Sequence, residues 1–513
     1  MLPASDFGRP QRPGPGDLPS GRVPAWVLWL LAFLPLRIAL AAVVPLLPEE
    51  AYHWNFARHP DLGYYDHPPM IAWAIAAGRL VLGDTPLGVR VVPLLFSLGT
   101  SVVLARLARR FYGDTAATWT VILFTLAPVP LLVSESGFPD SPLLFFWTLT
   151  MSLVWDAISG ADPRRWIAAG AALGAAMLSK YTAILLVPSV FGYLLLSRSH
   201  RRQLLTPWPY LAGIVALVVF SPVVYWNWKH EWASFLFQSQ GRMKESRGGF
   251  SLGAYLRAQA LAPFALTAPL AGVALWRLFR STRPEEIFLR ACFVPMFLLF
   301  AVVSCLRPPH LLWPLASYMG VFVAMAGMIG EGDGKIARFY AGKRSALVAV
   351  SGVILLGGAA HLAWFLPYFS PLQGPYGWKE VAEAARSTRT QLPESAFFLG
   401  LGRKYTCTSQ LAYQLRLPYD VHGANLIGEK ALQYAYWSDP RQLQGRDAVV
   451  VVEGEIRAKE NLDELQRGFD TVQPAGEILV PVGRSTLYPS PPLKFQLYIG
   501  RGYRPPPPPV PGK

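Results

Sequence analysis

Residues 24–45 read PAWVLWLLAFLPLRIALAAVVP, an apolar run interrupted by a single charged residue, Arg37. A helix of this length is about 30 Å long, which matches the hydrocarbon core of a lipid bilayer. Comparable apolar runs alternate with short charged clusters as far as residue 366. Only 15% of the 513 residues are charged, whereas about a quarter are charged in a typical soluble protein. The sequence therefore predicts a polytopic α-helical membrane protein.

The apolar runs predict about eleven transmembrane helices. Two of these runs are separated only by Ser179 and Lys180, so they form either a tight re-entrant pair or one broken helix. The predicted spans are residues 24–45, 89–107, 115–133, 142–158, 165–178, 181–197, 208–226, 254–277, 287–304, 311–329 and 345–366.

Basic residues mark every second loop between the predicted spans. Because loops rich in Lys and Arg stay in the cytoplasm, we expect a cytoplasmic amino terminus. Residues 46–88, 129–141, 228–252 and 305–310 then face outward, together with all of the chain after residue 366. This distribution explains the net charge of +15 without a nucleic-acid partner. The basic clusters are Arg106/Arg109/Arg110, Arg164/Arg165, Arg198/Arg201/Arg202, Arg277/Arg280/Arg283 and Lys335/Arg338/Lys343/Arg344.

The two ends of the chain differ in composition from the transmembrane domain, which we place at residues 23–366. Residues 1–22 are rich in Pro and Gly, which predicts a disordered cytoplasmic terminus. Residues 505–513 form a stiff, Pro-rich tail.

Residues 367–504 have the composition of a soluble domain. Apolar runs at 396–400 and 448–452 predict buried strands, and the charged segment 456–467 predicts a helix. We therefore expect a C-terminal periplasmic α/β domain.

The first outward loop holds an unusual group of polar residues. Glu49 and Glu50 lie where the first span ends, and Tyr64-Tyr65-Asp66-His67-Pro68-Pro69 follows. Acids at a membrane boundary are often only solvated, and an aromatic belt explains the tyrosines. Neither explanation covers three carboxylates and two histidines close to one interface. The loop is therefore the predicted site of the chemistry, and its double proline starts a surface helix at 69–82.

Asp140 adds a carboxylate from the second outward loop, 129–141, which contains no basic residue. It either caps the following helix or faces Glu49 and Glu50 across a cavity. Clustered carboxylates can orient an acceptor hydroxyl, serve as a general base or hold a divalent cation. Glu49, Glu50 and Asp140 are therefore candidate catalytic residues and candidate ligands of Mg²⁺ or Mn²⁺.

Cations also face outward near the same interface. Lys180 interrupts an otherwise apolar region. Burying a lysine in a membrane costs free energy, so such a residue usually has a function. Arg307 and His310 form a second positive site. Opposed acids and bases suit a substrate with a phosphate in the headgroup zone and a hydroxyl to be activated.

The stretches Glu49–Trp54 and Gly63–Met70 resemble the first-loop signature of bacterial polyprenyl-phosphate-sugar-dependent glycosyltransferases. This group contains protein O-mannosyltransferases, aminoarabinose transferases of lipid A and galacturonosyl transferases of lipopolysaccharide core. The resemblance also covers the Asp140 loop and most of the chain. Aminoarabinose transferases typically have Lys where this chain has His67, so that branch is less expected.

The resemblance implies a multi-span enzyme of the glycosyltransferase C superfamily in the bacterial inner membrane. It would move a sugar from an undecaprenyl-phosphate carrier to an acceptor on the periplasmic face, with inversion at the anomeric carbon. Lipid A, another glycan and a protein all remain open as acceptors, and the sugar is equally open.

Individual roles follow from the same resemblance. The family opens the first loop with an Asp-Glu pair whose Asp is the presumed base, so either Glu49 or Glu50 is the base here. Lys180 and Arg307, with His310 or His67, would neutralise the leaving phosphate. Asp140 and Asp66 would orient hydroxyls or a cation. The predicted substrate-binding residues are Tyr52, Tyr65, Asp66, His67, Lys180, Tyr181, Arg307 and His310.

Two other classes of protein fit parts of the sequence. A transporter or flippase of polyprenyl-linked sugars would also bind lipid phosphate, but such proteins usually have repeated halves and broken midplane helices. A non-catalytic scaffold would bind a partner through its outward α/β domain. The scaffold predicts no clustering of acids in the first two outward loops, so the transferase explains more of the sequence.

Overall fold

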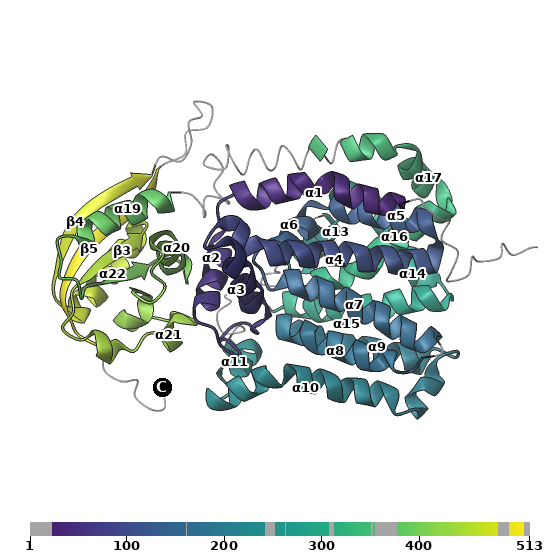
Figure 1. The fold of residues 1–513 in the computed structure, drawn as a ribbon, viewed down its shortest axis with the longest axis horizontal. Coiled ribbons are helices and arrows are strands. Elements are labelled where there is room, and N and C mark those ends of the chain that lie inside the picture. The colour runs from purple at the N-terminus through teal and green to yellow at the C-terminus, as the bar shows by residue number, and fades with distance from the viewer. Residues whose placement is uncertain are drawn as a thin grey trace, which may run out of the picture.

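The computed structural model has two parts, a bundle of helices and a five-stranded sheet with its own helices (Figure 1). Arg307 and His310 lie outside the described residues, as does most of the predicted span 345–366. The described residues are 23–160, 162–241, 252–261, 263–306, 312–349, 352–353, 377–480 and 492–506.

Within the described residues, five helices are long and apolar enough to cross a membrane, and two bent helix pairs raise that number to seven. These helices lie side by side in the bundle (Figure 1). The chain is therefore a multi-pass, mostly helical membrane protein, as its apolar runs predict. The five helices are α1 (Ala25–Val43), α4 (Pro86–Tyr112), α7 (Asp140–Ser159), α10 (Trp208–Lys229) and α15 (Pro284–Ser304). The bent pairs are α5 (Asp114–Thr125) with α6 (Pro128–Glu135), and η5 (Leu315–Tyr318) continued by α16 (Met319–Glu331) with α17 (Gly334–Gly342).

Two of the predicted spans are interrupted in the structure. The predicted span 115–133 bends by 78° between α5 and α6, because Pro128 cannot donate a backbone hydrogen bond and readily starts a new helix. The predicted span 254–277 divides into α13 (Leu252–Leu261) and α14 (Ala268–Arg280).

The break that the sequence predicts at Ser179 and Lys180 is also present. Lys180 adopts extended backbone angles, φ −159° and ψ 136°, which end α8 (Arg165–Ser179). The chain then continues through η1 (Tyr181–Leu185) into α9 (Leu186–Leu196). The break places a lysine side chain inside the bundle.

The two ends of the bundle differ in chemistry. At one end, the side chains of Arg110 and Arg165 both pair with Asp156. Arg277 and Arg283 pair with Glu331 in the same way. These arginines belong to the basic clusters that the sequence places in the cytoplasm.

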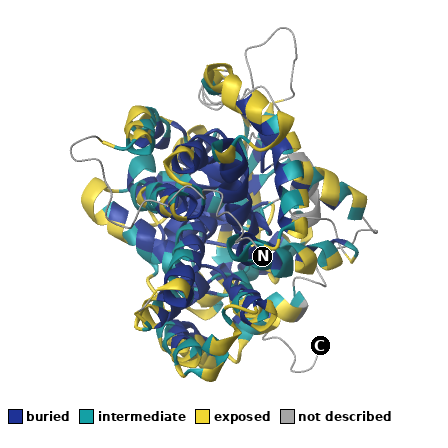
Figure 2. Cartoon of the chain, turned by 90° about the vertical axis from the view of Figure 1, so that its right-hand side faces the viewer, coloured by how far each residue is buried: buried dark blue, intermediate teal, exposed yellow. Residues whose placement is uncertain are grey.

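At the other end, two short helices from the first loop cover the bundle (Figure 1). They are α2 (Pro48–Arg58) and α3 (Met70–Leu82), and α3 coincides with the surface helix predicted after the double proline. Figure 2 shows that buried residues gather at the centre of the molecule and exposed ones at its rim.

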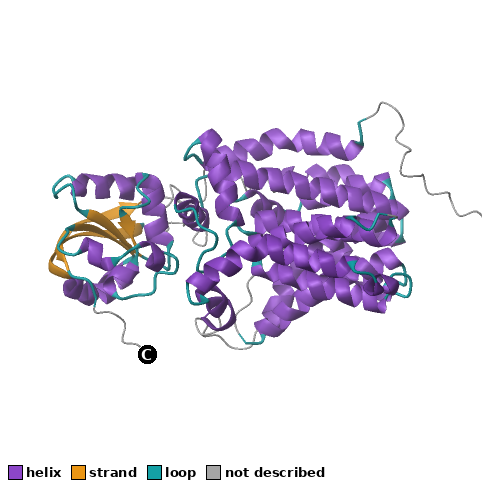
Figure 3. Cartoon of the chain, turned by 60° about the horizontal axis from the view of Figure 1, so that its bottom comes forward, coloured by secondary structure: helices purple, strands orange, loops and turns teal. Residues whose placement is uncertain are grey.

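The second part of the chain is a mixed sheet in the order β2-β1-β3-β5-β4. The first three strands in that order are parallel, whereas β5 runs antiparallel to both of its neighbours. Both strands predicted from apolar runs are present, and every residue of β1 is buried because helices cover the sheet (Figure 3). The strands are β1 (Phe397–Leu401), β2 (Val421–His422), β3 (Ala448–Glu453), β4 (Phe469–Val480) and β5 (Leu493–Tyr503). The helices are α19 (Trp378–Arg389), α20 (Thr406–Leu415), α21 (Tyr434–Trp437) and α22 (Glu455–Gly468).

The α/β part packs directly on the first-loop helices. One apolar cluster runs from Trp54 and Ile75 in that loop to Leu411 in α20. A hydrogen bond crosses the same boundary: Gln410 Nε2 donates to the Leu46 carbonyl at 2.9 Å. The candidate site residues of the first loop therefore lie between the bundle and the sheet.

Candidate active site

The helix α2 directs the two glutamates of the first loop to different surroundings. Pro48 occupies the first turn, where its missing N–H has no helical partner to lose. Glu49 and His53 are four residues apart and therefore share one face of the helix, whereas Glu50 points to another. The helix thus separates the roles that the two adjacent carboxylates can play.

Glu50 is completely buried and held by Arg90 of α4. Its oxygens accept from Arg90 Nε at 2.7 Å and Nη2 at 2.5 Å, and from the backbone N–H groups of Gly137 and Leu47. Burial raises the pKa of this carboxyl, but Arg90 and the two N–H groups outweigh it and leave the pKa below its ordinary value. Glu50 is therefore a fixed anion that joins α2, α4 and the loop 129–141.

His53 is also completely buried, and its two ring nitrogens differ. Nδ1 lies 2.7 Å from the carbonyl oxygen of Gly137, so Nδ1 carries the proton and donates it. Nε2 is buried and has no hydrogen-bond partner. Burial lowers the pKa of His53 to about 4, so the ring is neutral at pH 7. His53 therefore presents an unprotonated nitrogen inside the protein.

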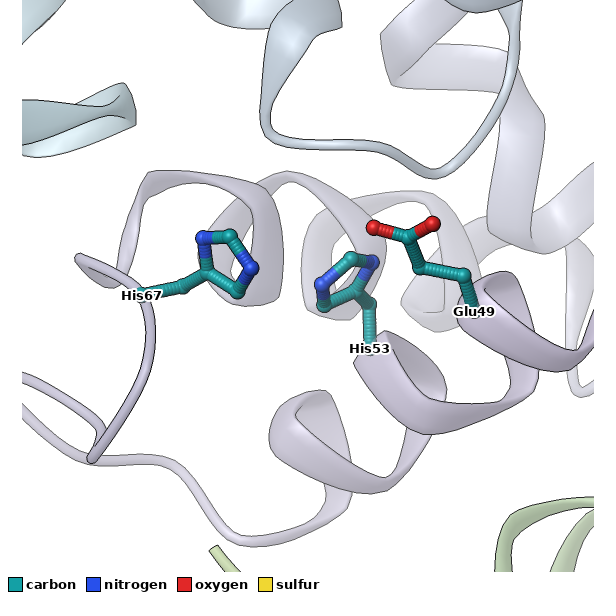
Figure 4. Close-up of side chains that lie close together, drawn as sticks. All are labelled: Glu49, His53 and His67. Atoms are coloured by element: carbon teal, nitrogen blue, oxygen red, sulfur yellow. The ribbon is translucent and has the colours of Figure 1, made fainter. Parts of the chain in front are cut away.

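His67 and Glu49 lie on either side of His53 (Figure 4). The rings of His53 and His67 have centroids 5.4 Å apart. One ligand atom from each of the three side chains lies within 4.8 Å of the others. The structure thus groups Glu49 with His53 and His67. Glu50 and Asp140, the other predicted cation ligands, do not belong to this group.

Asp140 and Lys180 bind each other beside this group. Lys180 Nζ donates to both oxygens of Asp140, at 2.8 and 2.9 Å, and both side chains are buried. Asp140 is the first residue of α7, and Lys180 is the residue at which the helix α8 ends. Gly137, which accepts a hydrogen bond from His53, lies in the loop that leads to Asp140, so the pair lies near α2. The predicted catalytic acid and the predicted phosphate-binding cation therefore form one ion pair.

Tyr52 and Asp66 meet at the boundary with the α/β part. Tyr52 Oη donates to Asp66 Oδ1 at 3.1 Å and accepts from the Gln433 backbone N–H at 3.2 Å. The Tyr52 ring stacks on Tyr405 with centroids 4.1 Å apart. Gln433 Oε1 also accepts from the Tyr65 backbone N–H at 2.6 Å. The α/β part thus holds the first-loop motif from outside the bundle.

Two predicted site residues, Tyr181 and Asp66, contact the segment that follows α10. Tyr181 Oη lies 2.7 Å from Ser234 Oγ, so Tyr181 contacts the segment after α10. The Asp66 carbonyl accepts from Gln238 Nε2 at 2.7 Å in that same segment.

Three partners in this site were not among the predicted site residues: Arg90, Tyr405 and Gln433. Arg90 is a charged residue just inside the predicted span 89–107. Charged residues in membrane helices are usually paired, so its position was a signal. Tyr405 and Gln433 carry no such signal, since their contacts depend on how the α/β part docks. His53 stands in the first-loop motif but was not selected as a site residue.

The fold agrees with that of a solved membrane glycosyltransferase. It matches ArnT from Cupriavidus metallidurans bound to undecaprenyl phosphate with a TM-score of 0.64, over 93% of this chain and 98% of ArnT, at 16% identity. The chain therefore has the fold class of ArnT.

Sequence comparison agrees with this class. Residues 66–226 match the family described as dolichyl-phosphate-mannose-protein mannosyltransferase. The lipid A galacturonosyltransferase RgtD of Rhizobium johnstonii is 28% identical over 53% of this chain and 58% of its own length. The undecaprenyl phosphate-α-4-amino-4-deoxy-L-arabinose arabinosyl transferase 2 of Pseudomonas fluorescens is 25% identical over 42% of this chain and 41% of its own length. The chain thus spans about half the length of these relatives, and the similarities confirm the resemblance expected from the first-loop motif.

Proposed function

We propose that this protein is an inverting membrane glycosyltransferase that moves a sugar from a polyprenyl-phosphate donor to an acceptor on the periplasmic face. The observation that carries this proposal is the position of His53, which lies beside Glu49 and donates to the carbonyl of Gly137, in the loop that leads to the Asp140–Lys180 ion pair. A carboxylate for the acceptor and a cation for the donor phosphate therefore lie around one buried ring.

Glu49 is the better candidate for the base. Glu50 is held by Arg90 and by two backbone N–H groups, so its lone pairs are already used. Glu49 would take the proton of the acceptor hydroxyl as its oxygen attacks the anomeric carbon. The bond from that carbon to the phosphate oxygen breaks on the opposite face, which inverts the configuration and releases polyprenyl phosphate.

Lys180 is the candidate cation for the leaving phosphate. Its ammonium group is buried in the ion pair with Asp140, where little water competes for it. A phosphate oxygen that reaches Nζ would share this ammonium group with Asp140 or displace the carboxylate. Charges fixed before the reaction stabilise a developing anion without reorganising solvent.

We also propose an orientation for the chain. We place the amino terminus and the paired arginines at the Arg277 end in the cytoplasm, with residues 46–88, 129–141 and the part after 366 in the periplasm. Close packing of the α/β part on α2 supports this placement, because both must lie on the same side of the membrane. About eleven spans remain our proposal for the transmembrane domain.

The acceptor has an approach beside Tyr65. A cavity of about 560 Å³ is lined there by Tyr65, Phe237 and Tyr436, together with the charged groups of Lys229 and Glu231. An amphiphilic acceptor with a polar head, such as lipid A, suits this mixture of aromatic and charged side chains. Glycans and proteins are the other classes that the relatives suggest.

The test is sugar transfer by the purified protein in vesicles that contain a polyprenyl-phosphate sugar and lipid A. We expect Glu49→Gln to lower kcat at least 100-fold with little change in stability, because the amide cannot accept the proton. The matched control is Glu383→Gln on an exposed face of α19. Full activity of Glu49→Gln would overturn the assignment, and movement of labelled donor across the vesicle without transfer would favour the flippase.

A further inference from the structure

Glu49, His53 and His67 form a compact group with the composition of a metal site (Figure 4). We propose that these three residues bind a divalent cation of the zinc type, one that prefers imidazole nitrogen to water. Cation binding at this site stands independently of the proposed sugar transfer.

The strongest evidence is the state of His53. Its Nδ1 donates to the Gly137 carbonyl, which leaves the lone pair of Nε2 available. Nε2 is buried without a hydrogen-bond partner, and an unsatisfied buried nitrogen is unfavourable. Histidines that bind metals commonly donate their other N–H to a backbone carbonyl, which fixes the tautomer and the ring orientation. The Gly137 carbonyl therefore holds His53 in the form that a metal ion requires.

The separations within the group suit one ion after a small movement. Each pair of ligand atoms lies within 4.8 Å. An ion bound about 2.1 Å from each ligand atom requires them to approach to roughly 3.5 Å. Small rotations of Glu49 and His67, which are only partly buried, can supply this movement.

The nature of the ligands selects the ion. Mg²⁺ prefers an octahedral set of oxygen ligands, whereas two imidazoles and one carboxylate suit Zn²⁺. Three protein ligands leave a position open on a tetrahedral ion, as in catalytic zinc sites. Within the function proposed above, this position would take an acceptor hydroxyl or a phosphate oxygen.

The surrounding charges allow a cation at this place. Arg90 is neutralised by Glu50, and Lys180 is neutralised by Asp140. Neither positive group therefore opposes a divalent ion. A monodentate Glu49 keeps its second oxygen, so metal binding leaves it able to accept a proton.

The experiment measures metal binding without any sugar donor. The full-length protein, purified in detergent with a tag free of histidine, is stripped with a chelator and titrated with Zn²⁺ and with Co²⁺. We expect one ion per chain by elemental analysis, and a visible Co²⁺ spectrum of a tetrahedral site that Zn²⁺ abolishes.

Variants assign the ion to this group. His53→Asn, His67→Asn and Glu49→Gln should each weaken Zn²⁺ binding at least tenfold. His200→Asn, which changes a histidine that contacts Tyr193, should bind like the unchanged protein. Size-exclusion profiles and melting curves show whether each variant is folded, and the partly buried His67 is the position at which folding is least at risk.

Two results would overturn the proposal: no bound ion in the stripped and reloaded protein, or unchanged Zn²⁺ affinity in folded His67→Asn and Glu49→Gln. Transfer by the chelated protein is measured separately. Metal binding without transfer would contradict the glycosyltransferase proposal alone, and transfer without metal binding would contradict the cation site alone.

Discussion

The carbonyl oxygen of Gly137 lies 2.7 Å from Nδ1 of His53, although 84 residues separate them in sequence. The N–H of the same glycine donates to Glu50 Oε1 at 2.9 Å. A Cβ atom at Gly137 would lie 3.1 Å from Val89 Cγ1 and 3.3 Å from Ile75 Cδ1, both closer than ordinary contacts. One residue of the loop 129–141 thus orients two side chains of the loop 46–88.

Gly137→Ala should therefore disturb both bonds at once. The methyl group pushes the loop from Val89, so we expect at least a tenfold loss of sugar transfer and a lower melting temperature. Gly192→Ala is the matched control, because nothing lies within 4 Å of a Cβ added there. Vesicle transfer assays and melting curves in detergent measure both effects. Equal behaviour of the two variants would contradict the role given to Gly137.

Arg90→Met should destabilise the protein by about 3–5 kcal/mol, because it leaves the Glu50 carboxylate buried without its partner. The double variant Arg90→Met/Glu50→Gln should lose less, since the unpaired charge is gone. Melting curves of the two single variants and the double variant give the coupling energy. A coupling energy near zero would show that the ion pair is not what holds Glu50.

Lys180→Met should raise the KM for the polyprenyl-phosphate donor at least tenfold, because the phosphate loses its buried cation. Asp140→Asn keeps the ammonium group and removes its carboxylate partner, so the KM for donor should fall or stay constant. Initial rates over a range of donor concentrations separate KM from kcat. The same KM change in both variants would indicate general disruption of the site.

The stability of the protein should depend on pH through His422. Burial, with the positive groups of Arg446 and His59, lowers the pKa of His422 to about 4 from an ordinary value of 6.5. The unfolded chain therefore binds a proton at His422 at a higher pH than the folded protein does. Stability is lost as pH falls from 6.5 to about 4. The lost free energy of unfolding is about 3 kcal/mol.

Melting temperatures at several pH values check this expectation, and His422→Asn should make the dependence shallower. His422 Nδ1 lies 2.8 Å from Ser438 Oγ, so Ser438→Ala is a useful comparison that keeps the titrating ring. An unchanged pH profile in His422→Asn would assign the dependence to other groups.

Much of the fold could be predicted from the sequence, because membrane crossing leaves a strong local signal. Apolar runs indicate the helices α1, α4, α7, α10 and α15, and Lys180 marks a real break. The bend between α5 and α6 was missed, although Pro128 lies at that point. Proline inside an apolar run does not always end a helix, as Pro93 within α4 illustrates.

The candidate site was only partly predictable. The first-loop motif identified Glu49, Glu50 and His67, because the residue types themselves are unusual at a membrane boundary. The different surroundings of the two glutamates depend on Arg90, forty residues after Glu50 in the chain. The grouping of His53 with Glu49 required helical geometry together with a carbonyl from a distant loop. Contacts of this kind have no local pattern in the sequence.

The bond between Gln433 and Tyr65 joins residues 368 positions apart, and it has a consequence for biosynthesis. A ribosome that adds about 5–20 residues per second needs roughly 20–70 s to pass from one to the other. During that interval the first loop has left the ribosome, while the surface that will cover it has not been made. The contact between the first loop and the α/β part therefore forms only after Gln433 has been synthesised, and a chain that terminates before this residue would lack it.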